Sequence, residues 1–351
     1  MIEAVDLFCG AGGLTAGLQK VGIKVKAGYD IEETCRFAFE FNNNAIFINK
    51  DVSLVGKSEI LSWYKKGCIK LLAGCAPCQP FSKYNQGRDT RNDKKWPLLY
   101  AFARIIKESI PDLITMENVP EVVRHQVYHD FVAELEQLGY FIWAGTIKCV
   151  DYGLPQQRKR HVLLASKFGE IGLIPPTHNK DSWITVKKAI GHLPPISAGE
   201  TCKKDRLHRA MALSEINLQR IKHSKQGGSW KDWPEELRAE CHKKASGASY
   251  PAVYGRMSWE QPSPTITTLC YGYGNGRFGH PEQDRAISLR EAAIFQAFPE
   301  NYQFCDPEHP ILLTKVGKMI GNAVPVTLGE IIGKSFIAHL EQVGNKVKYS
   351  Q

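Results

Sequence analysis

A cysteine that could act as a nucleophile lies between a proline and a glutamine in the run Cys75-Ala76-Pro77-Cys78-Gln79-Pro80-Phe81-Ser82. The run follows an apolar segment, residues 69–73, whose composition is typical of a strand. Open α/β sheets bind their ligands at the carboxyl ends of such strands. A thiolate at Cys78 could form a covalent intermediate. A Cys75-x-x-Cys78 pair could equally be a redox pair or half of a metal site, so these residues alone leave both interpretations open.

A glycine-rich loop follows the first apolar run, in Asp6-Leu7-Phe8-Cys9-Gly10-Ala11-Gly12-Gly13. Glycines between a strand and a helix allow a tight turn and close approach of the backbone to a ligand. Asp30 closes the second predicted strand, where a carboxylate can bind ribose hydroxyls. The loop lacks the third glycine of the dinucleotide fingerprint. It therefore predicts a nucleoside cofactor without a pyrophosphate, such as S-adenosylmethionine, with a simple glycine turn as the alternative.

The elements that would position these residues alternate along the first 166 residues. Apolar runs predict strands at 4–8, 25–29, 45–48, 69–73, 112–116, 141–148 and 161–165, and amphipathic patterns predict helices at 13–20, 32–41, 97–108 and 128–138. This alternation predicts a doubly wound, mainly parallel sheet. After Pro175-Pro176 the chain becomes rich in Gly, Pro, Ser and basic residues, which is typical of a smaller, loop-rich domain. From residue 311 helical periodicity returns, and we expect that segment to pack on the first domain.

Composition narrows the class of protein. With 351 residues, 43% hydrophobic and 23% charged, the chain is expected to be a soluble globular protein of two domains with no membrane span and no signal peptide. Its ten cysteines include no second Cys-x-x-Cys, so no metal site is expected. The net charge is +9, and residues 171–284 hold 16 Lys and Arg against 11 Asp and Glu, which favours a polyanionic partner.

Several short motifs in order resemble the C5-cytosine-specific DNA methyltransferases of the bacterial modification-methylase type. They are the loop from Asp6 to Gly13, Pro77-Cys78-Gln79, Glu117-Asn118-Val119, Gln156-Gln157-Arg158-Lys159-Arg160, Arg290-Glu291-Ala292-Ala293 and Gly321-Asn322-Ala323-Val324-Pro325. The resemblance implies the Rossmann-like doubly wound sheet of S-adenosylmethionine-dependent methyltransferases. It assigns residues 1–170 with 305–351 to a catalytic and cofactor-binding domain and 171–304 to a target-recognition domain.

The resemblance also implies the reaction and the residues that perform it. The Cys78 thiolate would add to C6 of a flipped-out cytosine in a specific double-stranded DNA sequence, so that C5 takes the methyl group and S-adenosylhomocysteine leaves. Glu117 would meet N3 and the exocyclic amine, Arg160 would hold O2, and Arg158 would support the same region. Cys75 would then be a small buried neighbour.

Further positions follow from the same resemblance. The expected cofactor contacts are Phe8, Gly10, Gly12, Gly13, Asp30, Ile31, Asp51, Val52, Leu98 and Asn322; Ile31 stands where many relatives carry tryptophan. The segment 82–96 would close over the flipped base. The expected DNA contacts are Ser82, Gln86, Arg88, Arg256, Thr267, Thr268 and Arg277, with Thr268-Leu269 as the pair near the flipped base and Lys225 as a further candidate.

Three alternatives compete with this hypothesis: a tRNA cytosine-C5 methyltransferase, a dithiol oxidoreductase and a non-catalytic DNA-binding module. The first is disfavoured because the Cys-Phe-Thr tripeptide typical of that branch is absent. The other two hypotheses do not explain why Cys78, Glu117 and Arg160 are all present. We further expect a monomer acting in the prokaryotic cytoplasm or nucleoid, paired in many such systems with a restriction endonuclease. The recognised DNA sequence does not follow from one chain.

Overall fold

The structure is a computed structural model that describes residues 1–77, 97–244 and 251–349. Contacts within the chain divide it into two compact units. The first unit comprises residues 1–152, 159–177 and 324–351, and the second comprises residues 153–158 and 178–323. The chain thus leaves and re-enters the first unit twice. None of the helices in the described part is long and apolar enough to cross a membrane.

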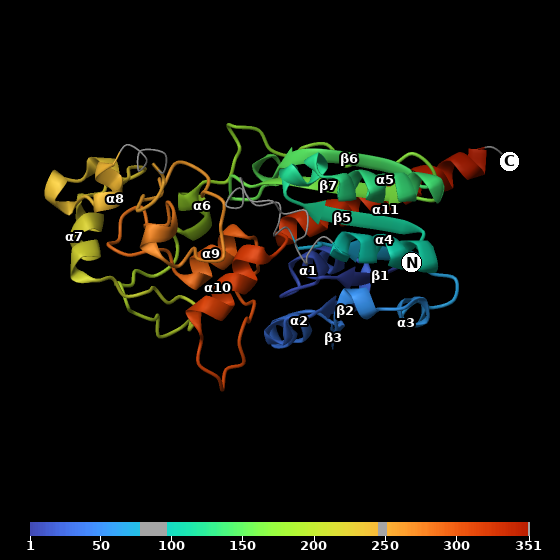
Figure 1. Ribbon diagram of the computed structural model, residues 1–351, viewed down its shortest axis with the longest axis horizontal. Coiled ribbons are helices and arrows are strands. Elements are labelled where there is room, and N and C mark those ends of the chain that lie inside the picture. Colours follow the sequence, from blue (N-terminus) through green and yellow to red (C-terminus); the bar gives the residue numbers. More distant parts are fainter. Residues whose placement is uncertain (78–96, 245–250, 350–351) are drawn as a thin grey trace. The chain divides into compact units, whose positions relative to one another are not determined.

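A seven-stranded sheet forms the centre of the first unit, in the order β3-β2-β1-β4-β5-β7-β6 (Figure 1). The strands are β1 (Ile2–Leu7), β2 (Lys24–Asp30), β3 (Ile46–Asn49), β4 (Ile69–Gly74), β5 (Leu113–Asn118), β6 (Phe141–Lys148) and β7 (Lys159–Ser166). The pairs among β1 to β5 are parallel, whereas β7 is antiparallel to both of its neighbours. The chain order reverses between β1 and β4, so this is the switch point at which open sheets bind ligands.

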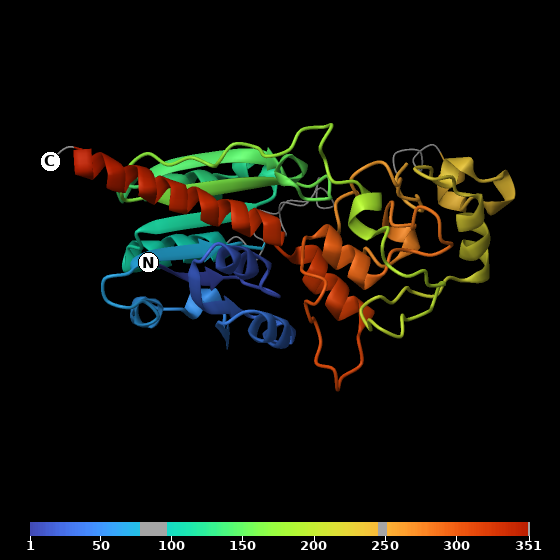
Figure 2. The same ribbon diagram turned by 180° about the vertical axis from the view of Figure 1, so that it is seen from behind.

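Helices cover both faces of this sheet. On one face, α1 (Gly13–Lys20) packs against α11 (Val326–Tyr349), which runs along the strands (Figure 2). On the other face lie α3 (Lys57–Ser62), α4 (Pro97–Ser109) and α5 (Gln126–Gln137). α2 (Arg36–Asn42) packs beside β3. β1 and β5 are buried along their whole length because both faces of the sheet are covered there, whereas β6 at the edge is only half-buried.

The main core of the first unit lies between the sheet and α3 to α5. Leu72 and Ile114 are fully buried on the strands, and Phe102 of α4 contacts Phe131 of α5 at a ring separation of 5.4 Å. Each such side chain contributes on the order of 1.5–3 kcal/mol when it is removed from water. This core fixes the backbones of β1, β4 and β5, whose ends carry the candidate site.

The second unit has fewer regular elements. Its helices are α6 (Val186–Ile190), α7 (Glu215–His223), α8 (Glu240–Lys243), α9 (Leu289–Phe295) and α10 (Leu313–Asn322), and the strand pairing among its described residues consists of isolated bridges. One core cluster is built on Trp230, Trp233 and Tyr273. Buried ion pairs supplement it, with Arg285 Nη2 lying 2.7 Å from Glu291 Oε1 at nearly zero exposure. Loops here are held by polar contacts more than by a sheet.

The predicted α/β class with a doubly wound sheet is confirmed, and the sheet is mixed because β6 and β7 form an antiparallel pair at its edge. The compact units differ from the expected division in three places: residues 153–158 belong to the second unit and residues 171–177 to the first, and in the longest difference residues 305–323 belong to the second unit. The reason is that α10 packs on α9 rather than on the sheet. The catalytic and target-recognition roles of the two units stay predictions.

Candidate active site

The carboxyl ends of β1, β4 and β5 meet at one edge of the first unit. Leu7 of β1 pairs with Gly74 of β4, and Gly74 pairs with Met116 of β5. The residues that follow in each strand are therefore neighbours: the glycine loop after Leu7, Cys75 after Gly74, and Glu117 after Met116. Sequence motifs far apart along the chain come together here because parallel strands end on the same side.

The glycine loop makes an unusually tight turn between β1 and α1. Phe8 has φ 60°, Gly10 has φ 51° and Gly12 has φ 88°, so the backbone enters the left-handed region three times in five residues. Such a conformation is strained for phenylalanine, and strain of this kind clusters at binding sites. A Cβ at Gly10 would meet no atom of the described residues within 4 Å, so among these residues the loop borders open space at Gly10. α1 then begins at Gly13.

Asp30 anchors this loop from the end of β2. Its Oδ2 accepts a hydrogen bond of 2.8 Å from the Gly10 N–H, and its Oδ1 accepts one of 2.8 Å from the Glu32 N–H. Each carboxylate oxygen can accept a further hydrogen bond, so the side chain can shape the loop and still bind a hydroxyl. Ile31, the next residue, has 71% of its surface exposed. An apolar side chain thus stands in solvent beside the loop.

The remaining expected cofactor positions are spread over neighbouring elements. Asp51 follows β3, which pairs with β2, and its Oδ1 accepts a hydrogen bond of 2.8 Å from the Ser53 N–H. Val52 is buried, and Leu98 is partly buried in the first turn of α4. Asn322 is exposed at the end of α10, in the second unit. The structure leaves their role as cofactor contacts a prediction.

Glu117 is held between two side chains in the first unit. It pairs with Val162 of β7, and Arg160 stands two residues before Val162, on the same face of the strand. Arg160 Nε lies 2.7 Å from Glu117 Oε1, with only 13% and 4% of the two side chains exposed. Cys75 Sγ lies 2.8 Å from the other oxygen, Oε2, and donates its S–H to it. A buried carboxyl with a cation on one side and a thiol on the other is suited to proton sharing with a bound base.

Cys75 is therefore not the small buried neighbour expected from the sequence. It is partly exposed and hydrogen-bonded to Glu117 rather than buried behind the loop. The strand order explains this, because Cys75 and Glu117 each follow directly on the paired residues Gly74 and Met116. The contact could not be predicted from the sequence, because predicting it requires the register in which β4 pairs with β5.

Four of the expected residues lie outside the described part of the chain, namely Cys78, Ser82, Gln86 and Arg88. Their neighbours on the amino-terminal side are described as far as Pro77. Here Asn118, which follows Glu117, donates from Nδ2 to the Ala76 carbonyl oxygen at 3.2 Å. β5 thus supports the backbone of the segment that leads to Cys78.

Arg158 belongs to the second unit and is 3% exposed. Its Nη1 donates to the Ile266 carbonyl oxygen at 3.0 Å, and its Nη2 lies 3.4 Å from the Gly321 carbonyl oxygen. The guanidinium therefore joins the stretch around Thr267 to the end of α10. The expected role of Arg158 in supporting the catalytic region stays a prediction.

The Thr267–Thr268 backbone packs directly on α10. A Cβ at Gly321 would lie 2.3 Å from the Thr267 carbonyl carbon, and one at Gly317 would lie 2.6 Å from the Tyr271 ring. Only glycine allows this approach. The threonine side chains are partly exposed, and Leu269 is 47% exposed. The loop thus presents its side chains while its backbone is fixed.

Two arginines expected to contact DNA are engaged inside the second unit. Arg256 is 4% exposed, and all three of its guanidinium nitrogens donate to protein acceptors, including the Asp284 carboxylate. No donor remains for DNA, so we remove Arg256 from the expected contacts. Arg277 is partly buried and donates from Nη1 to the carbonyl oxygens of Gly227 and Gly228. Lys225 is exposed.

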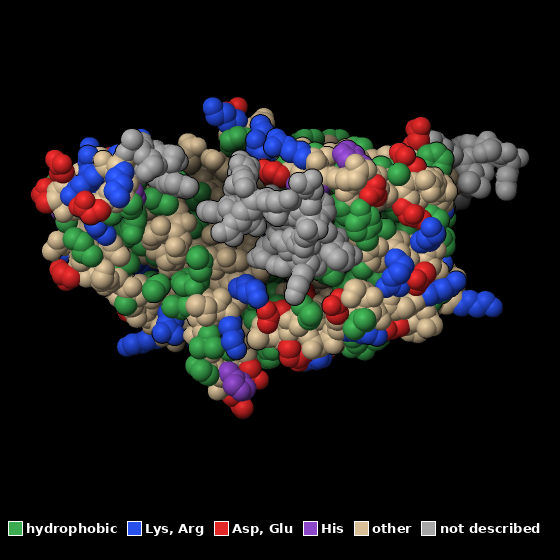
Figure 3. Space-filling view, in the orientation of Figure 1, with side chains coloured by type: hydrophobic (Ala, Val, Ile, Leu, Met, Phe, Trp, Pro, Cys, Tyr) green, Lys and Arg blue, Asp and Glu red, His purple; other side chains and the backbone are tan. Residues whose placement is uncertain are grey.

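The surface of the second unit carries both signs of charge. In Figure 3, Lys and Arg side chains over the region of α7 and α8 lie beside Asp and Glu side chains.

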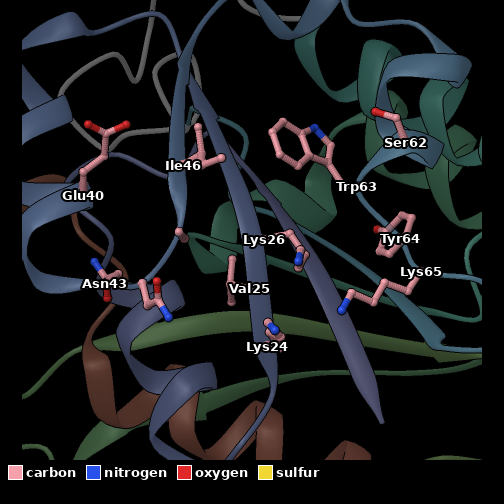
Figure 4. Close-up of a pocket in the computed structure, with 12 residues that line it drawn as sticks. Lys24, Val25, Lys26, Glu40, Asn43, Ile46, Ser62, Trp63, Tyr64 and Lys65 are labelled. Atoms are coloured by element: carbon pink, nitrogen blue, oxygen red, sulfur yellow. The ribbon is translucent and has the colours of Figure 1, made fainter.

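A cavity of about 610 Å³ lies in the first unit and is lined by residues that include Lys24, Lys26, Trp63 and Lys65 (Figure 4). It borders the amino-terminal ends of β2 and β3, away from the switch point, so it is not the candidate site. Among the described residues, no group of three or more His, Cys, Asp and Glu side chains could hold a metal.

Similarity to known proteins extends over nearly the whole chain. The sequence profile described as C-5 cytosine-specific DNA methylase matches residues 2–338. The Type II methylase M.HgiDII of Herpetosiphon aurantiacus is 53% identical over 345 residues, which cover 97% of each chain. The Type II methyltransferase M.Eco47II of Escherichia coli is 30% identical over 97% of this chain and 80% of its own.

Solved structures share the fold at low sequence identity. A protein assigned as a DNA modification methyltransferase, encoded within an Escherichia coli prophage, superimposes with a TM-score of 0.74 at 22% identity, covering 97% of this chain and all of its own. The Dnmt2 methyltransferase of S. pombe gives a TM-score of 0.60 at 14% identity over 96% of this chain and 99% of its own. These two likenesses concern the fold alone.

Proposed function

Because the chain belongs to the C-5 cytosine-specific DNA methylase family, we propose that it transfers a methyl group from S-adenosylmethionine to C5 of a flipped-out cytosine in a specific double-stranded DNA sequence. The observation that carries this proposal is the buried carboxyl of Glu117, which Arg160 holds at the carboxyl end of β5. The chain continues towards Cys78 from the carboxyl end of the neighbouring strand β4. The family and the geometry point to the same edge of the sheet.

The chemistry assigns a task to each side chain. The Cys78 thiolate adds to C6 of the cytosine, while the Glu117 carboxyl shares a proton with N3 and so stabilises charge in the ring. Arg160 keeps that carboxyl in place and binds O2. S-adenosylmethionine supplies the electrophilic methyl group and leaves as S-adenosylhomocysteine. Loss of the C5 proton and elimination of the thiolate then restore the aromatic ring.

The glycine loop is suited to hold this cofactor. Phe8, Gly10, Gly12 and Gly13 would line its nucleoside, since among the described residues the loop borders open space at Gly10. Asp30 and Asp51 would bind its hydroxyl and amine groups. Exposed Ile31 gives an apolar surface for the adenine. The remaining contacts that we propose are with Val52, Leu98 and Asn322.

DNA recognition is assigned to the second unit and to the segment that leads on from Cys78. Thr267 and Thr268 are presented on a fixed backbone, Lys225 is exposed, and Arg277 keeps a partly exposed guanidinium. Ser82, Gln86 and Arg88 would contact the DNA from the segment 82–96. The base must leave the stack to reach Cys78.

We propose that the chain acts as a monomeric modification methylase in the prokaryotic cytoplasm or nucleoid, alongside a restriction endonuclease. Support comes from bacterial relatives, which are named as Type II methylases or methyltransferases. None of these three names mentions an RNA substrate, so these relatives do not support the tRNA alternative. Size-exclusion chromatography with light scattering measures the oligomeric state, and bisulfite sequencing of DNA from expressing cells identifies the site.

The decisive experiment follows labelled methyl transfer from S-adenosylmethionine to duplex DNA. Wild-type protein should label DNA, and Cys78→Ser should abolish turnover while leaving DNA binding intact. Cys241→Ser is the matched control, since Cys241 is an exposed thiol of the second unit. DNA carrying 5-fluorocytosine should trap the wild-type protein covalently but not the Cys78→Ser variant. Labelling of RNA alone, or normal turnover by Cys78→Ser, would overturn the proposal.

A further inference from the structure

The geometry points to Cys75 as a positioning residue that orients the Glu117 carboxyl for the reaction. This inference rests on the proposed function, because it assigns Glu117 the task of meeting the target base. Cys75 is a second thiol near the nucleophile along the chain, and nothing in the proposed methyl transfer uses it. Its hydrogen bond to Glu117 gives it a task of its own.

The two oxygens of Glu117 are held in different ways. Arg160 Nε forms an ion pair with Oε1 at 2.7 Å, yet Oε1 accepts no aligned hydrogen bond from the described residues. Cys75 Sγ lies 2.8 Å from Oε2 with hydrogen-bond geometry. An ion pair is tolerant of angle, whereas a hydrogen bond is directional. Cys75 therefore supplies the directional contact that selects one rotation of the carboxyl plane.

Without such a contact the carboxyl plane would be poorly defined. The last torsion of a glutamate side chain has a broad preference, so the plane needs an external partner to fix it. A thiol is a weak donor, but its bond to a charged acceptor is strengthened. Meeting both N3 and the exocyclic amine of cytosine requires both oxygens to lie near the plane of the base. A rotated carboxyl would meet only one of these groups.

Both ends of the contact sit on a rigid backbone. The Cys75 N–H donates to the Leu7 carbonyl oxygen at 3.2 Å, which extends the pairing of β1 with β4 by one residue. Glu117 lies inside β5 and is paired with Val162 of β7. The separation of the two side chains is thus set by the sheet. A donor attached to such an anchor holds its acceptor more firmly than one on a loop.

The test compares Cys75→Ala with Cys75→Ser. Serine and alanine are similar in size, but only serine keeps a donor. We expect Cys75→Ala to lower kcat for methyl transfer roughly tenfold, the usual effect of losing one hydrogen bond in a transition state. The KM for S-adenosylmethionine and the Kd for DNA should stay within about twofold, because the contact orients Glu117 and leaves binding intact. Cys75→Ser should recover most of kcat.

A double-mutant cycle separates orientation from packing. Cys75→Ala should have little further effect in a Glu117→Gln background, because the carboxyl that shares a proton with the base, and whose plane Cys75 orients, is already gone. Cys202→Ala, at a partly exposed thiol of the second unit, is the control and should behave as wild type. Thermal unfolding of each variant checks that the fold is intact.

Each outcome bears on one proposal. An inactive wild-type protein would remove the proposed function and with it the basis of this inference. Active wild-type protein with an equally active Cys75→Ala variant would overturn the inference alone. Equal losses in the alanine and serine variants would also overturn it, because the volume of the thiol rather than its donor would then be responsible.

Discussion

Asp6 near the end of β1 carries a buried carboxyl whose replacement tests how the switch point is built. Asp6 is 1% exposed, its Oδ2 accepts a hydrogen bond of 2.7 Å from the Thr15 hydroxyl of α1, and its Oδ1 has no partner among the described residues. Burial raises the pKa of Asp6 from 3.8 to about 7; the Thr15 hydrogen bond opposes this rise and the charge of Asp30 adds to it. An ionised Asp6 is thus disfavoured in the fold.

The magnitude follows from linkage between proton binding and folding. Between pH 4 and 7 the folded protein keeps the Asp6 proton while the unfolded chain has released it, so stability falls as pH rises through this window. A rise from 3.8 to about 7 corresponds to about 4 kcal/mol of free energy of unfolding. Asp6→Asn keeps an oxygen that accepts from Thr15 but cannot ionise. We therefore expect the variant to match wild type near pH 4 and to exceed it by up to about 4 kcal/mol at pH 8.

Urea unfolding of both proteins at steps between pH 4 and 8 measures the difference. Taking the difference cancels the titration of all other groups that the two proteins share. Thr15→Val serves as the matched variant: loss of the donor should raise the pKa of folded Asp6 further, so that the fall in stability extends to higher pH. A difference between wild type and Asp6→Asn that stays constant from pH 4 to 8 would refute the reasoning, as would one that shrinks with rising pH.

Two further predictions concern the second unit. Glu291→Gln should destabilise this unit by roughly 3–5 kcal/mol in thermal unfolding, because Arg285 would remain buried without its partner charge, and a melting temperature equal to wild type at pH 7 would contradict this prediction. In wild type the pKa of Glu291 is lowered to about 2, so the stability that the ion pair contributes should persist down to about pH 4 and be lost towards pH 2. Gly321→Ala should lower the free energy of unfolding by about 1–3 kcal/mol and weaken DNA binding, because a Cβ would force the Thr267 backbone away from α10. Unchanged DNA affinity in a gel-shift assay would show that this packing is irrelevant to recognition.

The sheet could be predicted from the sequence because its signals are local. Short apolar runs separated by amphipathic helices set the strands, and the glycines after Leu7 mark the turn into α1. The antiparallel pairing of β6 and β7 was not predicted. A strand in either direction shows the same apolar pattern, so direction depends on how the connection packs rather than on the strand residues.

The candidate site was predictable to the extent that its residues follow strand ends. Glu117 and Arg160 come together because β5 pairs with β7 in a register that also aligns Glu117 with Val162. The Cys75 contact was missed because it depends on the alignment of β4 with β5 and on a side-chain direction. Motifs identify the residue types, whereas the register decides which of them touch.

Charge counts in the second unit overstate the number of cations that can face DNA. Four described arginines of this unit are at most 4% exposed, and three of them are paired with a carboxylate: Arg256 with Asp284, Arg285 with Glu291, and Arg290 with Asp205. The described residues of this unit pair only in isolated bridges, so such ion pairs and their hydrogen bonds to backbone carbonyls are needed to fix its loops. The exposed cations include lysines such as Lys222 and Lys225. Lysine binds phosphate as a point charge, while bidentate recognition of guanine favours arginine. The basic excess of this unit therefore indicates affinity for the DNA backbone more than it indicates the recognised sequence, which has to come from the few side chains presented on fixed loops.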